Sequence, residues 1–383
     1  MPGSPVYITD IASFLPNAPV DNDDMERILG QVGQRPSRAR RMVLRSNGIR
    51  QRYYAIDPET LLPNYNNAQL TAEAVRKLER NGFNLHEVSC LSCGTSIADQ
   101  LMPNHTVMVQ GELGLPPCEV VATSGVCLAG MTALKYAYLS VLSGEHYNAV
   151  ATGSELSSIM MKADNFSAET EAQVDKLGSQ PELAFEKDFL RWMLSDGAGA
   201  VLLEPTPAQG RLSLRIDWLH VYSYAGDMET CMYAGAVKND DGSISGWQRF
   251  SGRERDENSV MAVKQDVKLL NDNVLHYTVE RPLMDLIERY QLQADQFDYF
   301  IPHYSSNFFA DGVQASLQRV GLDIPRERWF TNLSEKGNTG SASIYIMLDD
   351  LYHSGKLKVG DTLLCYIPES GRFSSAMMKL TAV

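Results

Sequence analysis

The feature that most constrains the fold is an internal repeat in the 383-residue chain. Residues 127–144 (CLAGMTALKYAYLSVLSG) and 338–355 (NTGSASIYIMLDDLYHSG) both begin with small residues, continue with helical periodicity and end at Ser-Gly. Sixteen positions separate the opening residue from the serine in each segment. An apolar stretch that predicts a strand follows each helix, at 149–151 and 362–367.

The segments that precede these helices repeat in the same order. We expect a helix at 72–80 followed by a strand at 88–93, and their counterparts are a helix at 281–290 and a strand at 297–301. One such match between the two parts of the sequence could arise by chance, but four matching segments in the same order are hard to explain in that way. Alternating strands and helices predict an α/β protein with mostly parallel sheets that are covered by helices.

The repeat predicts two halves, an N-terminal one at 1–205 and a C-terminal one at 206–383. In parallel α/β sheets, ligands bind at the carboxyl ends of strands and at the helix N-termini beside them. His303 follows a predicted strand, and Cys127 and Asn338 each open a predicted helix. Pseudo-symmetric stacking of the halves is therefore expected to bring these three residues together.

Cys127 is a candidate nucleophile in the segment TSGVCLAG, at a loop-to-helix junction. The unpaired N–H groups and partial positive charge of a helix N-terminus stabilise a thiolate, so we expect a lowered pKa. Gly125, Ala129 and Gly130 leave room for an acyl chain. The alternative is a structural cysteine buried at a tight turn.

His303 and Asn338 are candidate hydrogen-bond donors. A neutral imidazole donates to a thioester carbonyl and stabilises a developing enolate, and an amide that never ionises can donate to the same oxygen. The alternative for His303 is a structural histidine with satisfied hydrogen bonds. The alternative for Asn338 is an N-cap, although its NH₂ and C=O can share the two roles.

Turns after the repeated strands supply further candidates. Residues 153–155 are expected to form one such turn, in which Glu155 is a possible auxiliary base and a surface carboxylate is the alternative. Residues 195–200 (SDGAGA) are expected to form a tight turn that runs into a strand at 201–203. The turn equivalent to 153–155 leads to a candidate oxyanion hole made by backbone N–H groups within Gly371, Arg372, Phe373 and Ser374.

The formal net charge of −13 argues against nucleic acid as a partner, because phosphate binding needs a basic surface. One stretch is an exception and holds seven arginines: Arg35, Arg38, Arg40, Arg41, Arg45, Arg50 and Arg52. Arg38, Arg41 and Arg45 are candidate contacts for a phosphate-bearing or acidic partner. The alternative is a solvated, salt-bridged face.

The chain shows no signal peptide and no apolar run of the roughly 20 residues that span a bilayer, so a cytoplasmic protein is expected. Its six cysteines are then expected to be free thiols. Cys90 and Cys93 form a C-x-x-C in an apolar run and are expected in the core, with a redox or metal role as the alternative. No metal and no bound cofactor are expected, because metal-ligand clusters and nucleotide motifs are missing.

Four motifs resemble signatures of β-ketoacyl-acyl-carrier-protein synthase III, of the thiolase superfamily: TSGVCLAG, DGAGAVLLE, the histidine of IPHYSSN, and GNTGSAS. NGIRQRYYA is similar to that family's early Gly-Ile-Arg-x-Arg segment, and the motifs follow the family's order across nearly the whole chain. The resemblance implies a duplicated, five-layered αβαβα thiolase-like fold and a homodimer. It implies an acyltransferase of fatty acid or polyketide biosynthesis.

The resemblance also implies roles for the candidate residues. A phosphopantetheine thioester, on coenzyme A or acyl carrier protein, acylates Cys127. His303 and Asn338 then promote carbanion formation on a second thioester, usually by decarboxylation of a malonyl group, and a Claisen carbon–carbon bond forms.

The chain departs from the family pattern near its N-terminus and after the histidine. Residues 41–45 (RMVLR) hold no tryptophan of the kind that stacks on the coenzyme A adenine, which favours a carrier protein as donor. The arginine-rich stretch then becomes a candidate site for the carrier and its phosphopantetheine. Residues 304–307 (YSSN) stand where the family usually has Gln-Ala-Asn.

A third departure lies near the C-terminus, where PESGRF replaces a Gly-rich turn, so that Glu369 and Arg372 are expected to add polar groups near the site. Together with FLPNAPVDN near the start, this stretch resembles the branch that makes dialkylresorcinols and stilbene precursors. In that branch a β-ketoacyl thioester is the second substrate, no decarboxylation is required, and the product cyclises.

Three other classes of protein remain as alternatives. A papain-like protease also uses Cys, His and Asn in this order, but its Cys-Gly-Ser-Cys-Trp segment is missing. An α/β-hydrolase with a cysteine elbow expects an acid between nucleophile and histidine. A catalytically inactive partner subunit of a heterodimer typically lacks the nucleophile, which this chain retains.

Overall fold

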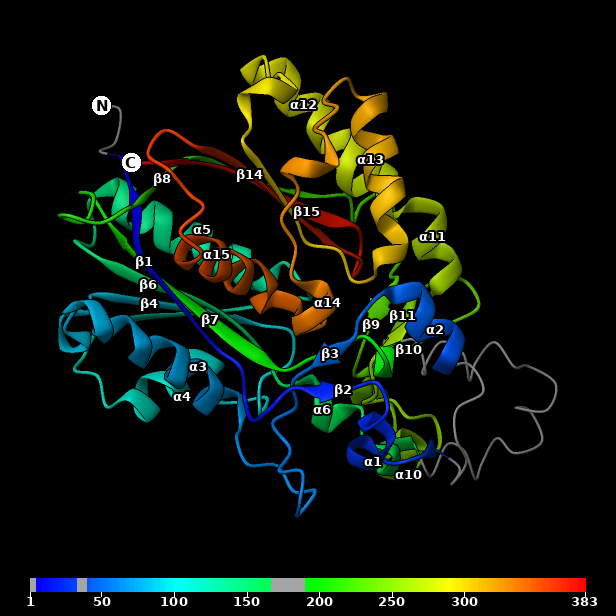
Figure 1. Cartoon of the computed structure of the whole chain (residues 1–383). Helices are drawn as coiled ribbons and strands as arrows, with labels where there is room; N and C mark the ends of the chain where they lie inside the picture. The colour runs from blue at the N-terminus through cyan, green and yellow to red at the C-terminus, as the bar shows by residue number, and fades with distance from the viewer. Residues whose placement is uncertain (1–4, 33–39, 167–189) are drawn as a thin grey trace.

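The computed structural model describes residues 5–32, 40–166 and 190–383. Nine strands form one continuous mixed sheet in the order β13-β14-β15-β8-β1-β7-β6-β4-β5 (Figure 1). The two ends of this sheet belong to the two halves of the chain, and they meet where β1 pairs with β8 at Tyr7–Arg215 and Ile8–Leu214.

The first part of the sheet contains β1 (Tyr7–Phe14), β4 (Cys90–Thr95), β5 (Glu119–Ser124), β6 (Ala149–Glu155) and β7 (Gly197–Glu204). β4 pairs in parallel with both β5 and β6, whereas β7 is antiparallel to β6 and β1. Every residue of β4 and β6 is buried, which is the pattern of parallel strands covered on both faces.

The second part of the sheet contains β8 (Leu214–Ser223), β13 (Tyr299–Pro302), β14 (Thr362–Glu369) and β15 (Ser374–Ala382). β13 is parallel to β14, and β15 is antiparallel to β14 and β8. The succession β13-β14-β15-β8 repeats β4-β6-β7-β1. The place of β5 is taken by a single parallel bridge between Phe300 and Trp329. The boundary between residues 205 and 206 stays a prediction.

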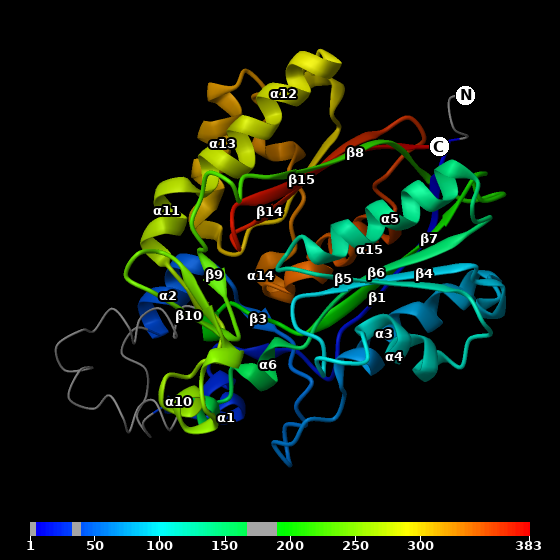
Figure 2. The ribbon, with the colours of Figure 1, turned by 180° about the vertical axis from the view of Figure 1, so that it is seen from behind.

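Helices form three layers that alternate with the two parts of the sheet (Figures 1 and 2). α3 (Asn67–Arg76) and α4 (His105–Leu113) cover the outer face of the first part. α5 (Ala129–Ser143) and α15 (Ser343–His353) lie side by side between the two parts. The outer face of the second part is covered by α11 (Val267–Leu275), α12 (Arg281–Tyr290) and α13 (Ala310–Arg319). The fold is the five-layered αβαβα arrangement that the sequence predicted.

The middle layer is packed so closely that glycines are required. A Cβ atom on Gly130 of α5 or on Gly153 of β6 would lie 2.3 Å from the carbonyl oxygen of Ser341, just before α15. The Tyr345 hydroxyl of α15 donates to the Gly130 carbonyl oxygen at 2.7 Å. These contacts tie the two helices that follow the Cys127 and Asn338 segments to one another.

Short elements gather at one end of the layers, beside the carboxyl ends of β4, β6, β13 and β14 (Figure 1). From the N-terminal part come β2 (Val20–Asp21), α1 (Met25–Leu29), α2 (Arg40–Asn47), β3 (Gln51–Arg52) and α6 (Ser157–Met160). The segment between β8 and α11 adds β9 (Met232–Tyr233), β10 (Ala236–Lys238), β11 (Ile244–Gly246), α10 (Gly252–Glu257) and β12 (Lys264–Gln265). They enclose a separate apolar cluster that includes Trp192, Cys231 and Phe373.

Several local predictions need correction. The helix expected at 72–80 begins earlier, as α3, and continues as a 3-10 turn at Lys77–Asn81. Residues 153–155 are the end of β6 rather than a turn, because all seven residues of that strand are buried in the sheet. Only Ser195 and Asp196 of the SDGAGA segment precede β7, since Gly197 and Gly199 already pack closely against Ile346 and Tyr345 of α15 as strand residues.

Two searches of the described ranges gave no candidates. None of their helices is long and apolar enough to cross a membrane. None of their His, Cys, Asp and Glu side chains group in threes or more at metal-binding positions.

Candidate active site

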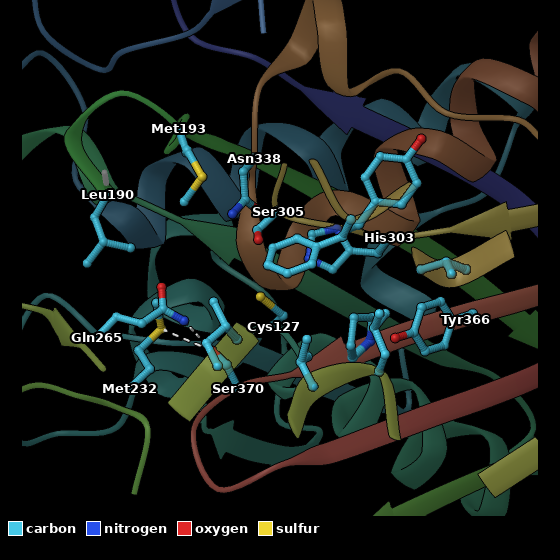
Figure 3. Close-up of a pocket in the computed structure, with 17 residues that line it drawn as sticks. Cys127, Leu190, Met193, Met232, Gln265, His303, Ser305, Asn338, Tyr366 and Ser370 are labelled. Atoms are coloured by element: carbon cyan, nitrogen blue, oxygen red, sulfur yellow. Dashed lines mark hydrogen bonds between the residues drawn. The ribbon is translucent and has the colours of Figure 1, made fainter. Parts of the chain in front are cut away.

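Cys127, His303 and Asn338 line one pocket, at the end of the layers where the short elements gather (Figure 3). Cys127 lies in the turn between β5 and α5, and its sulfur points into the space between the other two side chains (Figure 3). The sequence thus placed all three at the correct end of the fold. Their chemical roles stay predictions, which are developed below.

His303 follows β13, and its backbone N–H donates to the Tyr366 carbonyl oxygen of β14 at 2.8 Å. The side chain is 3% exposed, and its Nε2 has no hydrogen-bond partner among the described residues. Burial lowers the pKa of His303 to about 4, so the imidazole is neutral at pH 7. A neutral ring with a free nitrogen toward the pocket suits a hydrogen bond to a substrate oxygen.

Asn338 is held as if it were in a strand. Its N–H donates to the Met193 carbonyl oxygen at 3.0 Å, and its carbonyl oxygen accepts from the Ser195 N–H at 2.9 Å. The side-chain Oδ1 accepts from the Gly340 N–H at 3.0 Å, at the start of a 3-10 turn that leads into α15. The capping role and the donor role are therefore divided between the two ends of the amide, and the NH₂ group is left for the pocket.

The thiol of Cys127 does not have the lowered pKa that the helix N-terminus predicted. Burial raises its pKa, and the carboxylates of Glu369 and Glu155 raise it further. The sequence indicated the start of the helix but not that Glu369 and Glu155 lie close enough to Cys127 to raise its pKa. Cys127 is a protonated thiol at neutral pH in the free protein.

Glu155 is not a surface carboxylate, because it is only 5% exposed. Its Oε1 accepts from the Ser96 hydroxyl at 2.6 Å, the Ser96 N–H at 3.2 Å and the Ser341 N–H at 3.0 Å. Burial raises the pKa of Glu155 to about 7, against the lowering effect of these hydrogen bonds. A carboxyl group with this pKa can both accept and donate a proton near neutral pH.

The candidate oxyanion-hole residues are hydrogen-bonded to the segment between β8 and α11, residues 224–266. The Gly371 carbonyl oxygen accepts from the Cys231 N–H at 2.8 Å, and the Arg372 guanidinium donates to the Met228 carbonyl oxygen at 2.6 Å. Phe373 is fully buried with a φ of 58°, and Ser374 begins β15. None of these four side chains lines the pocket, so Arg372 does not add the polar group that the sequence predicted.

The pocket walls are mostly apolar and come from α11, α13, β14 and the segment between β8 and α11. The empty space, including the mouth, amounts to about 560 Å³. One polar pair interrupts the apolar wall, since the Gln265 amide donates to the Ser370 hydroxyl at 3.0 Å (Figure 3). Among the described residues, no Asp, Glu, Lys or Arg lines the pocket. Besides Cys127, His303, Asn338, Gln265 and Ser370, the lining residues are Leu190, Met193, Met232, Leu270, Val274, Leu275, Tyr304, Ser305, Phe309, Val313, Tyr366 and Pro368.

Ser195 and Asp196 support the site, although the sequence gave them no defined role. Ser195 binds Asn338 through its backbone, and its hydroxyl oxygen accepts from the Tyr53 N–H at 2.9 Å. The buried Asp196 carboxylate accepts from the Ala55 N–H at 2.7 Å and from Ser158. The SDG segment therefore holds both Asn338 and the N-terminal GIRQRYYA segment in place. The presence of these two motifs was the signal in the sequence that could have indicated this supporting role.

The arginine candidates lie outside the pocket. Arg38 and Arg35 fall outside the described residues. Arg41 and Arg45 are exposed on α2, whereas Arg40 is ion-paired with Glu26 at 3.1 Å. Neither Arg41 nor Arg45 lines the pocket that holds Cys127, and their role as a carrier contact stays a prediction.

Cys90 and Cys93 match the expectation of core cysteines, and the six cysteines match the expectation of free thiols. Cys90 and Cys93 are fully buried on β4, and all six cysteines are free. Burial raises the pKa of Cys93 to about 12, so that thiol is not reactive at neutral pH.

The five layers form a thiolase-like αβαβα fold, and its pocket brings Cys127, His303 and Asn338 together. Residues 287–371 match the family model described as 3-Oxoacyl-[acyl-carrier-protein (ACP)] synthase III C terminal. The chain is a protein similar to β-ketoacyl-acyl-carrier-protein synthase III that carries the C-terminal domain of that family, as its motifs predicted.

Curated relatives support this recognition along the chain. The β-ketoacyl-acyl-carrier-protein synthase III of Koribacter versatilis is 24% identical over 375 residues, which cover 97% of this chain and 96% of the relative. The enzyme of the same name from Clostridium perfringens is 26% identical over 318 residues and 83% of each chain. Both relatives are named as β-ketoacyl-acyl-carrier-protein synthase III, which is an acyltransferase, in agreement with the enzyme class predicted from the sequence.

Solved structures confirm the fold. The tetronic acid condensing enzyme AbyA1 superposes with a TM-score of 0.74 at 20% identity, over 98% of this chain and 99% of that chain. The synthase III FabH of Thermus thermophilus gives 0.71 at 20% identity, over 98% of each chain. OleA of Xanthomonas campestris, with bound lauric acid and lauroyl-CoA, gives 0.71 at 18% identity, over 98% of this chain and 99% of that chain. These likenesses do not fit a papain-like protease or an α/β-hydrolase.

Proposed function

We propose that the chain is an acyl-thioester condensing enzyme that carries the acyl group on Cys127. The observation that supports this most is the common pocket of Cys127, His303 and Asn338, in which the His303 Nε2 is unpaired and the Asn338 NH₂ is free of its capping role. Each of the three comes from a different segment, so their convergence is a property of the fold.

Acylation begins with the Cys127 sulfur attacking the carbonyl carbon of a donor thioester. The bond from that carbon to the carrier sulfur breaks, and the carrier thiolate takes up the proton that the Cys127 thiol gives away. The Cys127 N–H and backbone N–H groups within residues 371–374 are the candidate donors to the acyl oxygen.

Condensation uses the other two side chains. His303 and Asn338 donate hydrogen bonds to the carbonyl oxygen of a second thioester while its α-carbon loses carbon dioxide or a proton. The carbanion attacks the acyl group, a carbon–carbon bond forms, and Cys127 leaves as a thiolate that is protonated again. With a β-ketoacyl thioester, Glu155 is the candidate auxiliary base, and cyclisation to a resorcinol or cyclohexanedione product is the corresponding outcome.

We propose acyl carrier protein as the preferred donor and partner. The exposed arginines of α2, with Arg38 beside them in sequence, suit the phosphopantetheine phosphate and acidic groups of a carrier. The apolar pocket wall suits an acyl or pantetheine chain rather than a charged group. The substrates are thioesters of phosphopantetheine, on a carrier or on coenzyme A, and no resident cofactor is required.

We also propose a homodimer in which β5 pairs with a second copy. β5 is the edge strand of the sheet, and its residues are only partly buried, unlike the neighbouring β4. Met108 of α4 and Leu139 of α5 are exposed on the two helices that pack against this edge. An unpaired strand edge flanked by apolar side chains is a typical surface for a second copy.

Intact-protein mass spectrometry tests the proposed function. The protein is incubated with matched acyl chains on coenzyme A and on carrier protein, beside a Cys127→Ala variant. An adduct of acyl mass that the variant does not form supports covalent transfer, and the faster donor identifies the carrier. Absence of an adduct with every donor, in a folded protein, would contradict it and favour the alternative of a catalytically inactive partner subunit.

A further inference from the structure

Two carboxylates occupy equivalent places in the two halves. Glu155 is the last residue of β6, and Glu369 is the last residue of β14, the strand that repeats β6 in the second half. Each side chain reaches to the loop of the opposite half. Glu155 binds the Ser341 N–H after Asn338, and Glu369 binds the loop that carries Cys127.

Glu369 holds this nucleophile loop, residues 125–128, at two points. Its Oε2 accepts from the Val126 N–H at 2.8 Å and from the Leu128 N–H at 3.1 Å, on either side of Cys127. These are the N–H groups that a loop leading into a helix normally leaves unpaired. One carboxylate oxygen therefore brackets the nucleophile through the backbone.

The surroundings are shaped for a carboxylate. A Cβ atom on Gly125 would lie 3.1 Å from the Glu369 Oε2, and a Cβ atom on Gly371 would lie 3.3 Å from its Oε1. Within the described part of the chain, no ion pair to Lys, Arg or His neutralises Glu369. Burial raises the pKa of Glu369, and the two N–H groups oppose that change.

Few other titratable groups face the Cys127 thiol. Glu369 is the larger charged influence on it and Glu155 the smaller, and both oppose the thiolate. His303 lines the same pocket but is neutral at pH 7. The helix start favours a thiolate, so the carboxylate charge acts directly against the N-terminal field of α5.

We propose that Glu369 is a positioning residue for Cys127: its carboxylate fixes the nucleophile loop through the Val126 and Leu128 N–H groups, and its negative charge adds to burial in disfavouring a thiolate there. This inference rests on the proposed function, because a thiol that stays protonated before the donor binds matters only if Cys127 is the nucleophile. Acylation then removes the unfavourable approach of carboxylate and thiolate, since the thioester is neutral.

The test measures the alkylation of Cys127 by iodoacetamide from pH 6 to pH 10, followed by peptide mass mapping to separate it from Cys118. Glu369→Gln keeps an oxygen that accepts both N–H groups and removes the charge. We expect this variant to react about tenfold faster near pH 7, since one pKa unit corresponds to a factor of ten. Glu155→Gln, the equivalent change in the other half, is the matched control and should accelerate the reaction less.

Equal alkylation profiles for Glu369→Gln and the unchanged protein would overturn the inference. A midpoint below about 8 in the unchanged protein, under that of a free cysteine, would also overturn it whether or not the variant folds. Glu369→Ala removes both hydrogen bonds and should slow acyl-adduct formation even where alkylation is fast. Alkylation needs no acyl donor, so a failure of the proposed acyl transfer leaves this readout intact.

Discussion

The Cys127 loop and the Asn338 loop occupy equivalent places in the repeat but are built differently. The first leads directly into α5 and is held from outside by Glu369. The second is held in register with residues 193–195 and passes through a 3-10 turn before α15, with Glu155 beneath it. The first half completes its edge with β5, whereas the second has a single bridge at Trp329.

The difference shows how one topology supplies two kinds of chemistry. Cys127 lies in a turn that leaves its thiol facing the pocket, as covalent transfer requires. Asn338 is fixed by its backbone and by its own carbonyl oxygen, as a rigid hydrogen-bond donor requires. Symmetry brings the two helix starts together, and local hydrogen bonding suits each to its proposed role.

The largest effect is expected at the nucleophile. Cys127→Ala should lower turnover by about 10³-fold or more and abolish the acyl adduct, because Cys127 is the only thiol among the described residues that line the pocket. Turnover is measured with the preferred donor, and thermal unfolding checks the fold. An adduct that persists in this variant would place the nucleophile elsewhere, for example at Cys118.

The next effect concerns the donor at the end of β13. His303→Ala should lower the condensation rate by about 10²- to 10⁴-fold and leave acylation of Cys127 nearly unchanged. The two rates are measured separately, by product formation and by intact mass. If both rates fall together in a folded variant, the proposal that Cys127 carries out acylation and His303 assists condensation is wrong.

Asn338 permits its two roles to be separated. Asn338→Asp keeps the oxygen that caps the Gly340 N–H but replaces the donor NH₂ with a negative oxygen, so condensation should fall by about 10²- to 10³-fold with little loss of stability. Asn338→Ala should lose the same activity and in addition about 1 kcal/mol of unfolding free energy. Equal stability of the two variants would remove the capping role.

Glu155 sharpens the comparison through pH. Its pKa is about 7 in the folded protein and 4.5 in the reference state, so between these values the folded state holds the extra proton. The stability that this group contributes is therefore complete below pH 4.5 and falls as pH rises through 7. The unfolding free energy of the unchanged protein minus that of Glu155→Gln should fall by on the order of 2–3 kcal/mol between pH 5 and pH 7.5 in urea titrations. A difference that does not vary with pH would contradict this account of Glu155.

The smallest effect is expected at the surface of α2. Reversal of both charges, Arg41→Glu with Arg45→Glu, should raise the Michaelis constant for carrier-bound donors by about two- to fivefold at low salt, and less at high salt. Lys356→Glu with Lys358→Glu makes the same change of net charge in the exposed turn before β14, at the opposite end of that strand from the pocket. Equal constants in the two double variants would return α2 to a solvated face.

The sequence predicted the repeat, the helix-covered sheets and the meeting of Cys127, His303 and Asn338, because these depend on periodicity and on where strands end. The five αβαβα layers were implied by the family resemblance. It was wrong about the thiol pKa, and the surface-carboxylate alternative for Glu155 does not hold, since both depend on side chains from opposite halves. Glu369 was recognised only as a departure in PESGRF, and Gln265 not at all. Contacts across more than 100 residues, such as Glu369 with Val126, leave no local pattern.

The measurement that tests the central claim most directly is a two-stage single turnover. The protein is first loaded with an acyl group on Cys127, then mixed with the second thioester, and both the intact mass and the released product are followed. The account predicts that the adduct disappears as a carbon–carbon-bonded product appears in equal amount, and that His303→Ala forms the adduct but keeps it. Discharge of the loaded His303→Ala variant into product at the unchanged rate would contradict the division of chemistry between the two halves.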